Sequence, residues 1–145
     1  MGKYYIDTCI WINIFKKEYD FNKRKSIGKL SKKFIMKIIS SESDELFCSG
    51  IVLRELQLKL SPQEYAYAID SIEEIDRFNR VEVIEEDKKN ARKLESRYNF
   101  EISFYDLIHL VISKRLSLVL ITRDTGLIKA AKQNGVDART PEEAS

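Results

Sequence analysis

The chain has 145 residues, of which 43% are hydrophobic and 33% are charged. This length fits one domain with a sizeable buried core, so we expect a single domain over residues 1–145. The 25 Lys and Arg residues nearly balance the 23 Asp and Glu residues, which excludes a disordered chain and a bulk polycation. No apolar run is long enough to span a membrane, and no signal-peptide pattern opens the chain, so we expect a cytoplasmic protein without a membrane partner.

Short apolar runs alternate with longer helical patterns along the chain. Strands are expected at residues 4–6, 46–48, 81–84 and 118–121, with a weaker fifth strand at 136–138. A helix is expected to start at Ser61-Pro62-Gln63-Glu64, which combines an N-cap serine, a first-turn proline and a capping glutamate. The remaining helices are expected at about 87–98, at 103–114 and around 127–131, with Gly135 as the cap of the last. This alternation predicts an α/β fold with a central, mainly parallel sheet of about four to five strands.

Basic residues are concentrated in one part of the chain. Between residues 16 and 37, nine lysines and arginines stand against only Glu18 and Asp20. Such a segment could contact phosphates, whose neutralisation supplies affinity independent of sequence. Taken alone, this feature favours the alternative, a solvated helix face.

Four acidic residues occupy corresponding places in the expected elements. Each follows a strand closely or lies in the first turns of a helix, and they are Asp7, Glu55, Asp106 and Asp124. Any one of them also fits a helix cap, a turn or an exposed helix position. Because ligands bind outside the carboxyl ends of parallel strands, we expect the four carboxylates to converge. A cluster of hard oxygen ligands without Cys or His suits Mg²⁺ or Mn²⁺.

The motifs around these acids resemble, in the same order, those of the PIN-domain nucleases, and most of all the VapC-type toxins of type II toxin–antitoxin pairs. The resemblance covers essentially the whole chain and implies a PIN-like three-layer α/β/α domain. It is carried by Tyr4-Tyr5-Ile6-Asp7-Thr8, Ser49-Gly50-Ile51-Val52-Leu53-Arg54-Glu55-Leu56, Ser103-Phe104-Tyr105-Asp106-Leu107-Ile108-His109-Leu110 and Leu120-Ile121-Thr122-Arg123-Asp124.

The resemblance implies an Mg²⁺- or Mn²⁺-dependent endoribonuclease that hydrolyses RNA phosphodiester bonds. The catalytic and metal-binding acids would be Asp7, Glu55, Asp106 and Asp124. The expected partners are an RNA substrate, a cognate antitoxin and a second copy of the chain in a homodimer. We expect the antitoxin to dock on the apolar and basic region around Ile14, Phe15 and Phe34.

Further residues receive expectations from the same resemblance. Thr8 and Thr122 are expected to support the acids through their hydroxyl groups. Arg123 could contact a phosphate or simply be exposed. Gly126 stands where many relatives carry a further Asp or Asn, which leaves open whether one or two metal ions act.

Three side chains have structural interpretations from the sequence. Cys9 and Cys48 lack paired spacing and are expected to be small core hydrophobes. His109 is expected to be structural, although it lies three residues after Asp106 on the same helix face and could contact that acid indirectly.

Rival α/β functions lack their motifs. The chain has no Gly-x-Gly-x-x-Gly, no P-loop and no Gly-x-Ser-x-Gly, which argues against dinucleotide binding, Walker-type nucleotide binding and serine hydrolysis. Two alternatives remain, which are a housekeeping RNA-processing nuclease and a non-catalytic PIN-like module that binds RNA or protein.

Overall fold

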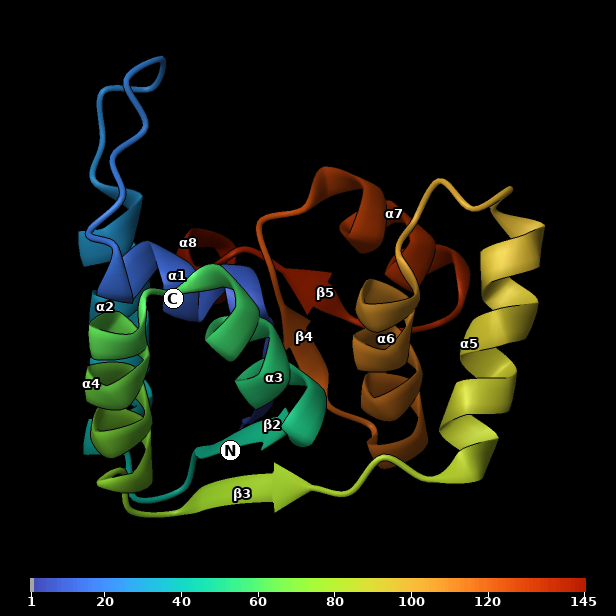
Figure 1. Ribbon diagram of the computed structural model, residues 1–145, viewed down its shortest axis with the longest axis horizontal. Coiled ribbons are helices and arrows are strands. Elements are labelled where there is room, and N and C mark those ends of the chain that lie inside the picture. The colour runs from blue at the N-terminus through green and yellow to red at the C-terminus, as the bar shows by residue number, and fades with distance from the viewer. Residues whose placement is uncertain (1) are drawn as a thin grey trace.

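Five parallel strands form one sheet through the middle of the molecule, whose computed structural model describes residues 2–145 (Figure 1). The strand order is β3-β2-β1-β4-β5, and each neighbouring pair is parallel. The predicted α/β class and parallel sheet are therefore confirmed. The strands are β1 (Lys3–Ile6), β2 (Glu45–Ser49), β3 (Phe78–Val81), β4 (Val119–Ile121) and β5 (Ala138–Arg139).

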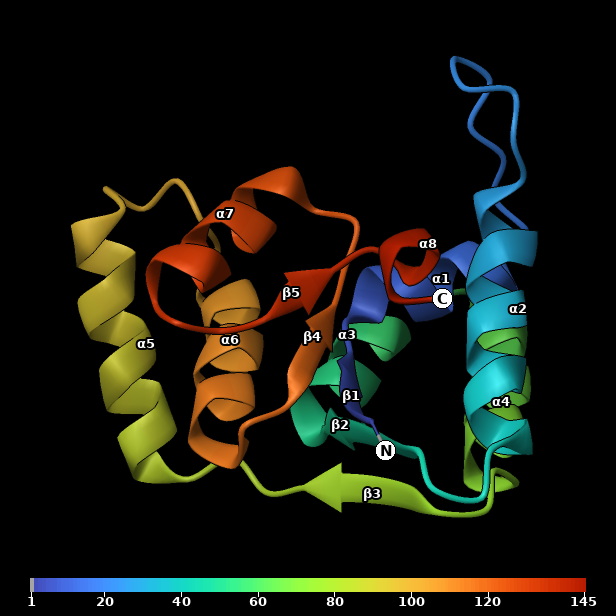
Figure 2. The same ribbon diagram turned by 180° about the vertical axis from the view of Figure 1, so that it is seen from behind.

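Helices cover both faces of this sheet and give it three layers. Helices α2 and α4 lie to one side, and α5 and α6 lie to the other (Figures 1 and 2). The central strands read as apolar because both of their faces are covered. The helices are α1 (Thr8–Phe15), α2 (Ile27–Ser40), α3 (Gly50–Lys59), α4 (Pro62–Glu73), α5 (Glu85–Arg97), α6 (Phe104–Leu116), α7 (Thr125–Gln133) and α8 (Pro141–Ala144).

The strand order reverses between β1 and β4. From β1 the chain proceeds to β2 and β3 on one side, whereas from β4 it proceeds to β5 on the other. The register pairs Tyr5 with Leu120 and Ile6 with Ile121, so the two strands end side by side. A crevice outside such a reversal is the usual ligand site of open α/β sheets. The residues that follow β1 and β4 therefore occupy the position where function is expected.

Helix α6 is buried around almost its whole circumference. Every residue from Leu107 to Ser113 is buried, because α5, α7 and β4 pack around the helix. A helix that is apolar on all sides is stable only in such surroundings. Its buried position fixes the direction of the side chains at its N-terminal end, among them Asp106.

Within residues 2–145, no helix has the length and apolar character needed to cross a membrane.

The third strand begins earlier than the sequence indicates. The Val-rich run at 81–84 predicts a strand, but the ladder with β2 uses Phe78–Val81. Residues beyond Val81 hydrogen-bond elsewhere, since the Ile84 N–H donates to Asp87 and the Glu82 carbonyl accepts from Arg115. The fifth strand, by contrast, begins later than the sequence indicates, at Ala138–Arg139 rather than at 136–138.

The two cysteines differ in their surroundings. Cys48 is fully buried in β2, and burial raises the pKa of its thiol to about 12, with Arg80 opposing the shift. Cys9 is not a simple core residue, which corrects the expectation, because it is partly buried and its Sγ donates to Asp7 Oδ2 at 3.3 Å. Burial also raises the pKa of Cys9 well above its ordinary value, and the charge of Asp7 adds to the shift.

We therefore expect neither thiol to react with iodoacetamide at pH 8 in the folded protein. Only the thiolate is an effective nucleophile, and a thiol of pKa about 12 is about 0.01% ionised at that pH. Mass spectrometry should show an unmodified chain under native conditions and two modified cysteines after unfolding in guanidinium. Rapid native labelling of Cys48 would contradict this burial.

Candidate active site

Asp7 leaves the end of β1 and caps the first helix. Its Oδ1 accepts the backbone N–H of Thr8 at 2.7 Å, which is an N-cap contact, and its Oδ2 accepts the hydroxyl of Thr122 at 2.7 Å. Thr122 directly follows β4, so this contact joins the two strand ends at the reversal point. The carboxyl group of Asp7 is almost completely buried and is held in one orientation by these donors.

Glu55 is held by one of its two carboxylate oxygens. Its Oε1 accepts the hydroxyl of Thr8 and faces Nε2 of His109, both at 2.8 Å. The other ring nitrogen of His109 lies 2.6 Å from the hydroxyl of Tyr5, which in turn lies 2.8 Å from the hydroxyl of Ser49. A buried chain of polar groups thus runs from Ser49 to Glu55 beneath the acids. Among residues 2–145, the one cation within 4.0 Å of Glu55 Oε2 is the ammonium of Lys59.

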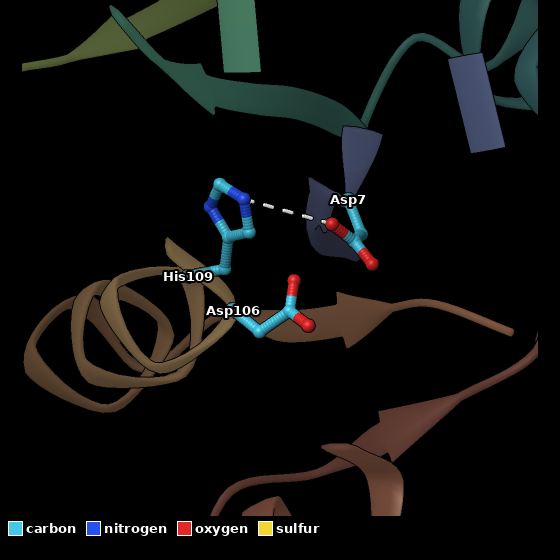
Figure 3. Close-up of side chains that lie close together, drawn as sticks. All are labelled: Asp7, Asp106 and His109. Carbon is cyan, nitrogen blue, oxygen red and sulfur yellow. Dashed lines mark ion pairs between the residues drawn. The ribbon is translucent and has the colours of Figure 1, made fainter. Parts of the chain in front are cut away.

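Asp106 points from the first turn of α6 toward Asp7, as does His109 one turn later (Figure 3). Ligand atoms of these three residues lie within 4.8 Å of one another, and the His109 Nε2 to Asp7 Oδ1 distance is 3.6 Å. The pKa of Asp106 is raised to about 6, first by burial and then by the charge of Asp7, with Glu55 and Asp124 adding to the effect. The carboxylates therefore share one electrostatic site that disfavours further negative charge.

Asp124 completes the set of predicted acids at the start of α7. Its Oδ1 caps the helix by accepting the backbone N–H of Leu127 at 3.0 Å, and the residue is otherwise exposed. Its charge reaches Asp106 through space and helps to raise the pKa of that acid. A Cβ added at Gly126 would stand 3.3 Å from Asp124 Oδ1, so a larger residue there would place its side chain beside that acid. In this chain the position offers no ligand atom.

His109 and Tyr5 take part in the site to an extent that the sequence did not reveal. His109 is fully buried; burial by itself lowers its pKa, but the hydrogen bond to Glu55 and the charges of Asp7 and Glu55 raise it overall. Both of its ring nitrogens already face hydrogen-bond partners, so it is better suited to hold Glu55 than to bind a metal ion. The spacing of His109 from Asp106 on one helix face indicated that His109 could lie near the acids, although not that it would contact Glu55. Tyr5 resembled any inward-facing strand residue.

The phosphate contact considered for Arg123 is not supported. All three guanidinium nitrogens donate inside the protein: Nε donates to Asn13, and Nη1 and Nη2 donate to the two carboxylate oxygens of Glu142 at 2.9 and 2.7 Å. A further bond from Nη2 reaches the hydroxyl of Ser31 at 3.0 Å. The side chain is only 16% exposed. Arg123 therefore ties the end of β4 to α1, α2 and α8.

We expect Arg123→Met to destabilise the protein without altering any activity of the acidic site directly. Removing one partner of a largely buried ion pair leaves the Glu142 carboxylate without its arginine donors and takes one of two donors from the Asn13 amide oxygen, at a cost of about 2 kcal/mol. This corresponds to a fall in melting temperature of about 4–8 °C for a chain of this size. Thermal unfolding followed by circular dichroism measures it, and an unchanged melting temperature would contradict the role assigned to Arg123.

The fold and the site together define an α/β domain with a carboxylate cluster at the point where its strand order reverses. The model of the PIN domain matches residues 4–133, and the chain belongs to this family. The family expected from the four motifs is thus confirmed.

Solved structures with the same fold include several toxin and toxin–antitoxin proteins. VapBC2 from Rickettsia felis, bound to a promoter DNA fragment, superposes with a TM-score of 0.67 at 14% identity, covering 95% of this chain and 98% of that chain. VapC20 from Mycobacterium tuberculosis, a toxin that cleaves the sarcin–ricin loop, gives 0.68 at 16% identity, covering 88% and 94%. VapBC-1 from nontypeable Haemophilus influenzae gives 0.66 at 21% identity, covering 97% and 98%. No curated protein matches the sequence.

Proposed function

We propose that this protein is a divalent-metal-dependent endoribonuclease and the toxin of a toxin–antitoxin pair. The observation that carries the proposal is the meeting of side chains from separate elements, since ligand atoms of Asp7, Asp106 and His109 lie within 4.8 Å of one another and His109 also contacts Glu55. Burial, followed by the charge of Asp7, raises the pKa of Asp106 to about 6 at this place. The family and the shared fold with VapC toxins support the same conclusion. The proposed catalytic and metal-binding acids are Asp7, Glu55, Asp106 and Asp124.

The donor set fits Mg²⁺ or Mn²⁺. In the described part of the chain no side chain donates a hydrogen bond to the Asp106 carboxylate, and Oε2 of Glu55 faces only a lysine 4.0 Å away. These oxygens are hard ligands available to a cation, whose charge would relieve the repulsion at Asp106. When bound, such an ion lowers the pKa of a water molecule and stabilises the charge that develops on the phosphate.

The protein's own groups would hold the acids in place for this reaction. Thr8 and Thr122 each donate a hydroxyl to one oxygen of Glu55 and Asp7, respectively. His109 directs Nε2 at the same Glu55 oxygen that Thr8 binds, which orients the second oxygen away from them. Carboxylates fixed in this way need little rearrangement in the transition state, and this preorganisation is the main source of electrostatic catalysis.

Cleavage of a mixed set of structured and single-stranded RNAs tests the activity. Purified protein, freed of any co-purified partner, is incubated with Mg²⁺, Mn²⁺ or EDTA beside the Asp7→Asn variant. We expect cutting that requires a metal ion and that the variant lacks. Metal-independent cutting, or equal cutting by the variant, would contradict the proposed site. Absence of cutting by folded protein across the set would favour the non-catalytic binding module.

An antitoxin is proposed to cover the groove between α1, α2 and α4. This groove has a cavity volume of about 530 Å³, an apolar floor that includes Trp11, Ile14 and Phe15, and a rim that includes Lys17 and Lys29. Phe34 does not belong to this surface, which corrects the expectation, because it is buried against Tyr4 in the core. The basic rim suits an acidic, amphipathic segment.

Growth after induced expression separates a toxin from a housekeeping nuclease. We expect the wild-type protein to arrest growth and the Asp7→Asn variant to have no effect. Normal growth with active wild-type enzyme would favour the housekeeping alternative.

The proposed homodimer is tested by light scattering of the purified protein, where a concentration-independent monomer would contradict it.

A further inference from the structure

An arm formed by residues 16–26 projects from the molecule between α1 and α2. Figures 1 and 2 show it rising above the end of the fold at which α6 and α7 begin. Its two sides are joined by Asp20 and Lys25, which exchange backbone hydrogen bonds of 2.8 and 3.1 Å. At its base, Gly28 N–H donates to the Glu18 carbonyl at 2.9 Å, and a Cβ at Gly28 would stand 2.5 Å from the Asn13 carbonyl. These backbone bonds hold the two sides of the arm together and join its base to the start of α2.

The arm carries a net positive charge, which is least opposed at its tip. Its five cations stand against two acids, Glu18 and Asp20. Of these cations, Lys25 faces Glu142 closely enough to lower the pKa of that carboxyl. In residues 2–145, no carboxylate lies within 4.0 Å of Lys23 or Arg24, and both side chains are exposed. The exposed lysines of α2 extend this charge along the same side, and they are Lys29, Lys32, Lys33 and Lys37.

Two aromatic rings accompany these charges. Phe21 is 84% exposed and Tyr19 is 45% exposed, with their ring centroids 4.9 Å apart in an edge-on arrangement. Tyr19 supports Phe21 from one side and leaves the ring of Phe21 largely open to solvent. A pair of adjacent exposed rings beside unpaired cations offers a flat apolar surface on which another ring can stack. An unpaired nucleobase is such a partner, and stacking on aromatic side chains is the usual mode of single-strand binding.

We propose that this arm binds a single-stranded segment of the RNA substrate, with a base stacked on Phe21 and phosphates beside Lys23 and Arg24. The inference rests on the proposed nuclease function and assigns the class of RNA that the enzyme takes. A base inside a duplex has both faces covered by its neighbours, so the ring of Phe21 selects an unpaired region. A protein partner is less suited to this end of the arm, because the apolar groove that it would fill lies at the base of the arm, on α1, α2 and α4.

The affinity of the protein for RNA that it does not cleave tests the arm. Fluorescence anisotropy measures the binding of a labelled single-stranded 12-mer and of a labelled duplex to the Asp106→Asn protein in EDTA. Two further proteins carry Asp106→Asn together with either Phe21→Ala or the Lys23→Gln/Arg24→Gln pair. Matched controls are Phe100→Ala, another phenylalanine that is 70% exposed, and the Lys93→Gln/Lys114→Gln pair on α5 and α6. Lys25 is left unchanged, because its charge helps to lower the pKa of Glu142.

We expect Phe21→Ala to weaken single-strand binding about tenfold and to change duplex binding less than twofold. The double substitution should reduce the slope of log Kd against log salt by about 1.4, which is about 0.7 for each phosphate that the arm no longer neutralises. Unchanged affinity in both arm variants, or an equal loss in the two controls, would overturn the proposal. Loss of duplex and single-strand binding alike in Phe21→Ala would overturn the stacking.

The two proposals can fail separately. Wild-type protein that never cuts RNA, yet binds single strands through the arm, would contradict the nuclease function and leave the arm's binding role. If the wild-type protein cuts RNA and the arm variants bind RNA as tightly as the unsubstituted arm does, the result would contradict only the proposed RNA binding by the arm.

Discussion

The Asp106→Asn variant is expected to lose metal-dependent RNA cleavage by about 100-fold or more while gaining stability. The amide cannot supply the negative charge that holds a divalent cation, so electrostatic stabilisation of the transition state is lost. The gain in stability has the opposite origin. Burial and the charges of Asp7, Glu55 and Asp124 raise the pKa of Asp106 to about 6, so the ionised carboxylate opposes folding in metal-free protein.

The sign of this effect sets its pH dependence. An unfolded aspartate titrates near 3.9, whereas Asp106 titrates near 6 in the folded state. The destabilisation is absent below pH 3.9, grows between the two values and is complete above about pH 6. Above that pH the asparagine variant should be more stable than wild type by about 1–2 kcal/mol, or roughly 3–6 °C in melting temperature.

Thermal unfolding in EDTA at pH 4 and pH 7.5 measures this difference, and RNA cleavage with Mn²⁺ measures the loss of activity. Glu101→Gln provides a control at an exposed acid near α6 and should change neither quantity. A variant less stable than wild type at pH 7.5, or a gain of equal size at both pH values, would contradict the electrostatic strain assigned to Asp106.

The second large effect is expected from His109→Ala. The side chain is completely buried and contacts both Tyr5 and Glu55, so its removal leaves a cavity and a buried carboxylate with Thr8 as its remaining close donor. We expect a loss of about 3–5 kcal/mol of stability, or roughly 10–15 °C in melting temperature. We also expect Mn²⁺ to bind about tenfold or more weakly, since residues that orient metal ligands affect affinity to this extent.

Two further variants separate orientation from packing. Ile112→Ala creates a cavity on the same buried helix without touching an acid, so it should lower stability but leave Mn²⁺ affinity unchanged in calorimetric titrations. Tyr5→Phe keeps the ring and removes one hydroxyl, leaving His109 and Ser49 without that partner at about 1–3 kcal/mol. Equal losses of Mn²⁺ affinity in His109→Ala and Ile112→Ala would show that His109 only fills space.

Local sequence patterns were sufficient for the parallel sheet and for placing Asp7 and Asp124 after the ends of β1 and β4. The alternation of strand-like and helical segments predicted a parallel sheet, and ligand binding at strand ends then predicted where Asp7 and Asp124 would lie. Ser61 and Ser103 cap their helices as their sequence context predicts. These features depend on residues close together in the chain, which is why they can be read from it.

Features that depend on distant residues could not be read in the same way. The hydroxyl of Tyr5 meets Ser49 and His109, which are 44 and 104 positions away, and no local pattern marks such a meeting. Arg123 resembled an exposed residue beside an acid, but Glu142 and Asn13 enclose it. The early end of β3 at Val81 has a similar cause, since contacts from Arg115 and Asp87 draw residues 82–84 away from the ladder.

The position of β1 in the sheet bears on when this protein can act. Although β1 is made first, it lies between β2 and β4, and Thr122 reaches Asp7 across 115 positions of the chain. A chain that is still being translated has neither this contact nor the charge of Asp124 until β4 has left the ribosome. The acids can therefore assemble only after every residue up to β4 has been made. A nuclease built on this strand order would be harmless to the RNA around it until that point of its own translation.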